Sequence, residues 1–92
     1  MDKYQLWILN RVGKDYGHYD KISNYAFRKN KLWLEFGKYK KYDPWEVLEN
    51  DPGYLIWAWK NVKNKLPTAF VDFIKDFSSD IKDLAEAQDD IF

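Results

Sequence analysis

Cysteine is absent from this chain of 92 residues, and histidine occurs once, as His18. The lack of cysteine excludes a disulfide scaffold and thiolate metal ligands. It also excludes a Cys/His catalytic pair, so that nucleophilic catalysis of this kind is not available. Asp15 and Asp20 flank His18, but three residues of one loop do not make a usual metal-ligand set. We therefore expect no catalytic residues, no metal, no cofactor and no enzymatic activity.

Long apolar segments are missing as well. No run approaches the roughly 18 residues that a membrane span requires. The first residues, Met1–Gln5, lack the basic start and apolar core of a signal peptide. The sequence thus predicts a cytoplasmic protein, and its length fits a single domain covering residues 1–92.

Aromatic residues, in contrast, are abundant: five Trp, seven Tyr and six Phe. Each aromatic side chain buries roughly 150–250 Å² when it enters a core. A few of them can build the core of so short a chain. The others either contact a partner or complete the rim of the core.

The charges of the chain sum to zero but are unevenly placed. Residues 1–42 hold ten Lys/Arg and four Asp/Glu, whereas residues 43–92 hold five and eleven. Such a division indicates two different surfaces. The alternative is that the two halves attract each other within the fold or within a dimer.

The N-terminal segment 2–12 has the signals of a short helix. Asp2 is a suitable N-cap, Gln5 stands at the capping-box position and Gly13 suits the residue after the helix. The alternation of apolar residues also permits a strand, through Tyr4, Leu6 and Ile8.

Residues 21–36 have the pattern of a β-hairpin, in whose first strand Ile22, Asn24 and Ala26 would alternate with Ser23, Tyr25 and Phe27. The polar segment 28–31 would turn the chain. In the second strand Leu32, Leu34 and Phe36 would line one face, and Trp33 would lie on the other. A lone hairpin is marginal in water, so we expect helices to cover one of its faces.

Two Asp-Pro pairs predict helix starts, because Asp caps a helix and Pro fits its first position. Asp43-Pro44 would begin a short helix over 44–49, and Asp51-Pro52 a longer one over 52–64. Within the longer helix Trp57 and Trp59 lie about 200° apart around the axis. We expect Trp59 to be the more buried of the two, since Leu55 and Val62 share its side.

From Pro67 onward, apolar residues recur at three- and four-residue spacing, which predicts a long amphipathic helix. Residues 78–80, Ser-Ser-Asp, are the point where this helix would kink or restart. The predicted fold class is therefore α+β, with a β-hairpin packed against about four helices and a long amphipathic helix at the C-terminal end.

A pair of motifs carries a family resemblance. Residues 36–40 read F-G-K-Y-K, and residues 51–57 read D-P-G-Y-L-I-W. Over about residues 32–64 the chain resembles a small domain found at the C-terminal end of exonuclease X-like proteins and in short stand-alone phage and bacterial proteins. Lys41 replaces the second glycine of the usual pattern. The resemblance implies an accessory module, because the nuclease chemistry belongs to a separate domain.

The same region combines cations with aromatic rings. Lys and Arg neutralise phosphates, and exposed aromatic rings stack on unpaired bases. The sequence thus predicts a small accessory protein of a type that phages encode. This protein would bind either nucleic acid, with a preference for single strands, or an enzyme that processes nucleic acid. The alternative is that the lysines protect a hairpin edge while the tyrosines pack inward. The predicted nucleic-acid-binding residues are Arg28, Lys29, Lys38, Tyr39, Lys40, Lys41 and Tyr42.

Four carboxylates, Asp72, Asp76, Asp80 and Asp83, follow one another at helical spacing in the last predicted helix. The final residues, Asp-Asp-Ile-Phe with Phe92 last, are similar to the acidic tip of bacterial single-stranded DNA-binding proteins. The four carboxylates of the helix, together with Phe92, form a predicted protein-binding surface. They suggest a second function, an inhibitor or modulator of a host nuclease, polymerase or defence system. The alternative is a solvated helix face and a frayed end.

Overall fold

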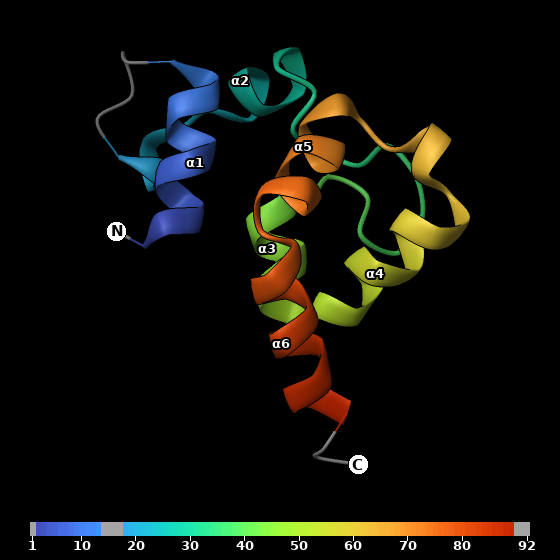
Figure 1. The fold of residues 1–92 in the computed structure, drawn as a ribbon. Helices are drawn as coiled ribbons and strands as arrows, with labels where there is room; N and C mark the ends of the chain where they lie inside the picture. The colour runs from blue at the N-terminus through green and yellow to red at the C-terminus, as the bar shows by residue number, and fades with distance from the viewer. Residues whose placement is uncertain (1, 14–17, 90–92) are drawn as a thin grey trace.

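The computed structural model describes residues 2–13 and 18–89, and the regular secondary structure of these residues is helical (Figure 1). No strand forms in these two segments, so the predicted α+β class with a β-hairpin is wrong, and the fold is all-α. None of the described helices has the length and hydrophobicity of a membrane-spanning segment. The elements are α1 (Lys3–Val12), the 3-10 helix η1 (Tyr19–Lys21), α2 (Asn24–Lys29), α3 (Pro44–Asn50), α4 (Pro52–Asn61), the 3-10 helix η2 (Lys63–Lys65), α5 (Thr68–Asp76) and α6 (Ser78–Asp89).

The hairpin prediction fails because its first half forms the short helix α2. Ser23 caps this helix by accepting a hydrogen bond from the backbone N–H of Ala26. Ala26 and Phe27 of α2 are buried, and Ile22, which precedes the helix, is buried in the same cluster. Local capping and burial thus favour a helix where the alternation alone suggested a strand.

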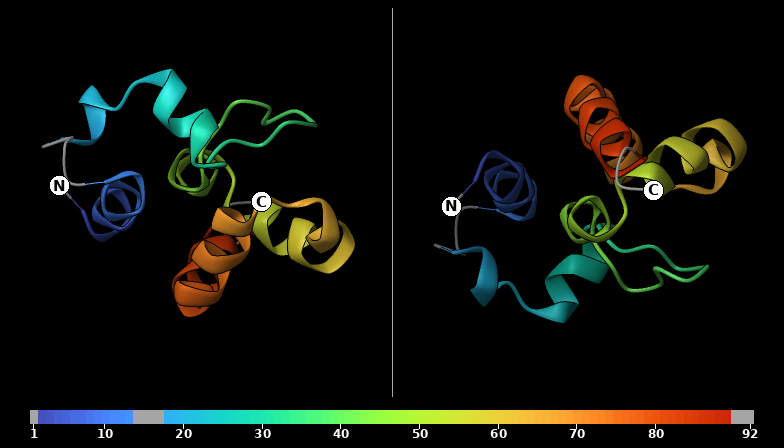
Figure 2. Two further views of the ribbon diagram at one scale, coloured as in Figure 1. Left: turned by 90° about the horizontal axis from the view of Figure 1, so that it is seen from above. Right: turned by 90° about the horizontal axis from the view of Figure 1, so that it is seen from below.

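The predicted second strand is part of an irregular loop that projects beyond α2 and α3 (Figure 2). Two backbone hydrogen bonds of Leu34 join the beginning of this loop to its end. The N–H of Leu34 donates to the carbonyl of Tyr42 at 3.1 Å, and the carbonyl of Leu34 accepts from the N–H of Lys41 at 2.8 Å. Leu32 and Leu34 are fully buried and Trp33 is partly buried. Leu32 and Trp33 pack in one hydrophobic cluster and Leu34 packs in another, so the predicted strand with Leu32 and Leu34 on one face and Trp33 on the other is wrong.

The predicted helix starts are confirmed. Asp2 forms a capping box with Gln5 at the start of α1, and Asp43 forms one with Glu46 at the start of α3. At α4 the side chain of Asp51 accepts from the N–H of Tyr54. The long C-terminal helix is interrupted at Phe77 and begins again at Ser78, within the segment predicted to kink or restart it. Helix α4 ends earlier than predicted, at Asn61.

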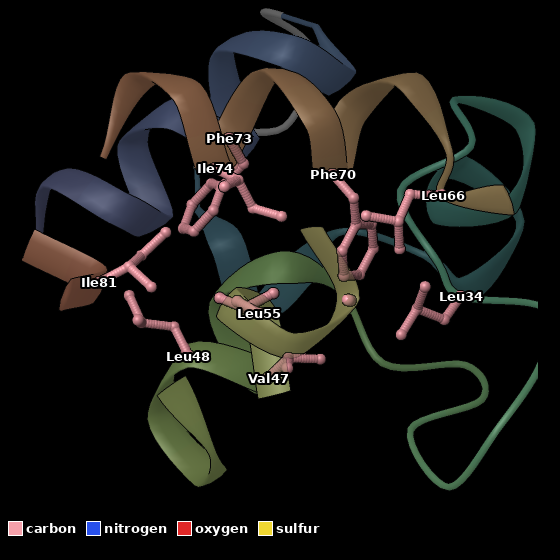
Figure 3. Packing of buried hydrophobic residues seen from close by; sticks show 10 residues of the cluster. Leu34, Val47, Leu48, Leu55, Leu66, Phe70, Phe73, Ile74 and Ile81 are labelled. Atoms are coloured by element: carbon pink, nitrogen blue, oxygen red, sulfur yellow. The ribbon is translucent and has the colours of Figure 1, made fainter. Parts of the chain in front are cut away.

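The main core lies where α3, α4, α5 and α6 meet (Figure 3). Trp59 is partly buried beside it, whereas Trp57 is 49% exposed, so the predicted order of burial is confirmed. The core residues are Leu34, Val47, Leu48, Leu55, Ala58, Leu66, Phe70, Phe73, Ile74 and Ile81. A second cluster joins α1 and α2 to this body and contains Ile8, Ile22, Ala26, Phe27, Leu32 and Ala69.

Candidate nucleic-acid interface

The tyrosines of the predicted interface have a structural role. The ring of Tyr39 packs edge-on against Tyr42 and Tyr54, with centroids 5.4 and 4.8 Å apart. Its hydroxyl donates to the carboxylate of Asp51 at 3.0 Å. Burial, together with this hydrogen bond, raises the pKa of Tyr39 to about 12. Tyr39 and Tyr42 therefore pack inward, as the alternative interpretation expected, although the hairpin edge of that interpretation does not form in the described residues.

The two motifs of the family resemblance are in contact with each other. The ammonium of Lys38 lies 3.7 Å from the carboxylate of Asp51, although the Lys38 side chain is 68% exposed. Gly37 has a left-handed backbone with φ of 78°, and a Cβ at this position would lie 3.2 Å from the hydroxyl of Tyr54. The spacing of the motifs thus reflects how the loop attaches to the start of α4.

Three of the predicted cations meet in a hollow of about 540 Å³ between α2 and the loop. Arg28 comes from α2, and Lys40 and Lys41 come from the loop. We call this hollow the Trp33 groove, and its lining includes Tyr25, Arg28, Trp33, Glu35, Lys40 and Lys41. Lys29 is exposed on α2 but does not line the groove.

Two aromatic rings of the groove were missed in the sequence. Tyr25 is 71% exposed on α2. Trp33 is partly buried and stacks on Phe27 with an interplanar angle of 10° and a centroid distance of 5.9 Å. The available signal for Trp33 was its predicted position, on the strand face opposite Leu32 and Leu34. Tyr25 could not be found, because its exposure depends on α2 being a helix.

Trp33 also lines two further hollows, so that the groove extends on either side. One hollow, of about 330 Å³, adds Lys31 and Lys65 to the cations of this surface. The other, of about 420 Å³, includes Tyr19 and Trp45 and again Lys41. The surface around Trp33 thus carries cations from α2, the loop and η2.

Two lysines of this surface have an unusual backbone conformation. Lys31 has φ of 55° and Lys41 has φ of 71°, which is the left-handed region that glycine favours. They lie before and after the segment that carries Trp33. At Lys41, where the motif pattern predicted from the sequence would have a glycine, the backbone has a conformation that suits glycine.

The acidic residues of the last two helices bind α1. Arg11 lies 2.6 Å from Asp72, the indole N–H of Trp7 donates to Asp76 at 2.8 Å, and the hydroxyl of Tyr4 donates to Asp80 at 3.1 Å. Asp80 also pairs with Lys3, and these hydrogen bonds lower the pKa of Asp80. The attraction between the basic and acidic halves is therefore intramolecular at these positions. Asp83 is exposed, and Phe92 lies outside the described residues.

The loop around the single histidine has no organised ligand set. His18 and Asp20 are exposed, and Asp15 lies outside the described residues. Among residues 2–13 and 18–89, no group of three or more potential metal-ligating side chains comes together.

Comparisons of the chain with protein-family models, with curated proteins and with solved structures gave no match.

Proposed function

We propose that this protein is a non-enzymatic nucleic-acid-binding accessory protein and that it binds through the Trp33 groove. One observation carries this proposal: three cations from two separate elements line one hollow together with two aromatic side chains. The cations are Arg28, Lys40 and Lys41, and the rings belong to Tyr25 and Trp33. An accessory role also agrees with what the family resemblance implies.

The chemistry of nucleic acids matches both components. Lysine and arginine side chains neutralise phosphates and release their counterions, which makes binding depend on salt. Stacking of an unpaired base on an aromatic ring contributes roughly 1–3 kcal/mol. Trp33 is held by its contact with Phe27, so little conformational freedom is lost when a base stacks on it.

The test is charge reversal within the groove, by Arg28→Glu combined with Lys40→Glu. A matched control, Lys60→Glu with Lys82→Glu, changes the net charge equally at exposed positions on α4 and α6. Affinities for fluorescent single- and double-stranded DNA and RNA are measured by anisotropy over a range of salt concentrations. We expect the groove variant to lose most of its affinity and to reduce the slope of log affinity against log salt by about 1 to 2.

The control variant should retain most of its affinity. The proposal is wrong if the parent protein binds none of the four nucleic acids. It is also wrong if the control loses as much affinity as the groove variant, because the effect would then reflect net charge alone.

The second function suggested by the sequence, a protein inhibitor or modulator that acts through its acidic residues, has less support. Asp72, Asp76 and Asp80 already contact α1, so a basic partner would have to displace that helix.

A further inference from the structure

We propose that the Trp33 groove recognises an unpaired guanine and that Glu35 binds its Watson–Crick edge. This inference rests on the proposed function and specifies its substrate. It concerns the one residue of the groove whose charge opposes phosphate binding.

Glu35 is placed between two groups of cations. It lines the Trp33 groove with Lys40 and Lys41, and it also lines the neighbouring hollow with Lys31 and Lys65. Its side chain is exposed, and no salt bridge within the described part of the chain involves it. The carboxylate is therefore available to a ligand although cations surround it.

A carboxylate selects bases by its hydrogen-bonding capacity. When ionised it only accepts hydrogen bonds, and its two oxygens can accept a pair of parallel ones. The Watson–Crick edge of guanine carries two adjacent donors, N1–H and the N2 amino group. Adenine, cytosine and uracil each place an acceptor beside their donor on this edge, so an acceptor would face one carboxylate oxygen. Only guanine can bind both oxygens of Glu35.

The base must be unpaired, because this edge is occupied within a duplex. Tyr25 and Trp33 line the groove beside Glu35 and can stack on the inserted base. The volume of about 540 Å³ falls within the range of small-ligand sites, roughly 300–1,000 Å³. The lysine pair of the Trp33 groove and the lysine pair of the neighbouring hollow would then bind the phosphates that precede and follow the guanine.

The test uses single-stranded octamers that differ only in one central base, G, A, C or U, with anisotropy as the readout. We expect the parent protein to bind the guanine octamer on the order of tenfold more tightly than the others. Inosine, which lacks the N2 amino group, should lose most of this preference. 7-Deazaguanine, which keeps both donors, should retain it.

Glu35→Gln should abolish the preference without weakening binding to the other octamers, because it replaces one of the two acceptors with a donor. Glu49→Gln, at an exposed position on α3, removes the same charge and should keep the preference. If the parent binds all octamers equally, or if Glu35→Gln keeps the preference, the guanine assignment is wrong and the proposed function stands. If the parent binds no octamer and no longer strand, both fail.

Discussion

Lys41 combines a strained backbone with a place in the candidate interface. Its φ of 71° lies in the left-handed region, which costs a residue other than glycine roughly 1–2 kcal/mol. Its side chain lines the Trp33 groove. Strain of this kind persists where the surrounding structure imposes it, and it is common at functional sites. A glycine would relieve the strain but would remove the cation.

Lys41→Gly should therefore raise stability and lower nucleic-acid affinity. The relief of strain exceeds the greater chain entropy of glycine, roughly 0.5–1 kcal/mol, so the free energy of unfolding should rise by about 0.5–1 kcal/mol. Urea denaturation measures the first effect, and anisotropy measures the second.

Lys41→Ala separates the two effects, because alanine removes the charge and keeps the Cβ. This variant should lose as much affinity as Lys41→Gly without gaining stability. A Lys41→Gly variant that is less stable than the parent would show that the left-handed backbone at this position is not strained.

The residues of the groove show what a sequence reveals at this scale. Arg28, Lys40 and Lys41 were predicted from the sequence, Lys40 and Lys41 as cations clustered with tyrosines and Arg28 as a neighbour of that cluster in the expected hairpin. The sequence did not distinguish Tyr39, which packs against Tyr54, from Tyr25, which is exposed. That distinction depends on tertiary contacts across the loop and α4.

At the scale of elements, the helix starts predicted from local signals were confirmed, whereas the predicted pairing of two segments into a hairpin was wrong. The capping boxes of α1 and α3 join residues three positions apart, so the sequence contains them completely. A β-hairpin, in contrast, needs two segments to pair. The segment before Trp33 had a helical alternative in α2, with Ser23 as its cap. Six residues are too few for a stable isolated helix, so the packing of Ala26 and Phe27 stabilises α2.

Helix α1 is joined to α5 and α6 by an ordered set of contacts. Arg11 contacts Asp72, Trp7 contacts Asp76 and Tyr4 contacts Asp80. Residue numbers thus fall along α1 as they rise along α5 and α6, so α1 runs antiparallel to these helices. Beneath these polar contacts the ring of Trp7 lies edge-on to Phe73, with centroids 5.2 Å apart. The separation of basic and acidic residues along the sequence thus contributes to the attachment of α1.

Reversing one charge of this contact should weaken the attachment of α1. Arg11→Glu places two carboxylates together and should lower the free energy of unfolding by roughly 0.2–1 kcal/mol, the range measured for ion pairs at protein surfaces. Adding Asp72→Arg should restore most of the loss, and 1 M salt should reduce both effects. Chemical denaturation of the four proteins of this cycle gives the coupling. Additive effects would mean that Arg11 and Asp72 do not interact in solution.

At the scale of the whole molecule, one buried carboxylate connects its parts. Asp43 is fully buried, caps α3 and accepts a hydrogen bond from the hydroxyl of Tyr19 in η1. Tyr19 belongs to the cluster around α1 and α2, whereas Val47 in the same helix α3 belongs to the main core. Burial raises the pKa of Asp43 to about 7, although the bonds from Tyr19 and from the N–H of Glu46 oppose the rise.

The raised pKa makes global stability depend on pH. In the unfolded chain Asp43 loses its proton near pH 3.8, whereas in the folded protein it keeps the proton up to about pH 7. Between these values the folded state binds more protons, so the free energy of unfolding falls as pH rises, by at most about 1.4 kcal/mol per pH unit. Above about pH 7 this contribution is constant.

Urea denaturation between pH 4.5 and 8 should therefore show the parent becoming less stable toward neutral pH. The lowered pKa of Asp80 acts at more acidic pH, where protonation weakens its contacts with Lys3 and Tyr4, so it does not contribute within this range. Asp43→Asn keeps a side chain that caps helices well but cannot ionise. This variant should lose the decline in stability, whatever its absolute stability. A parent whose stability is flat over this range, or an Asp43→Asn variant that declines equally, would show that Asp43 is already ionised in the folded protein at acidic pH.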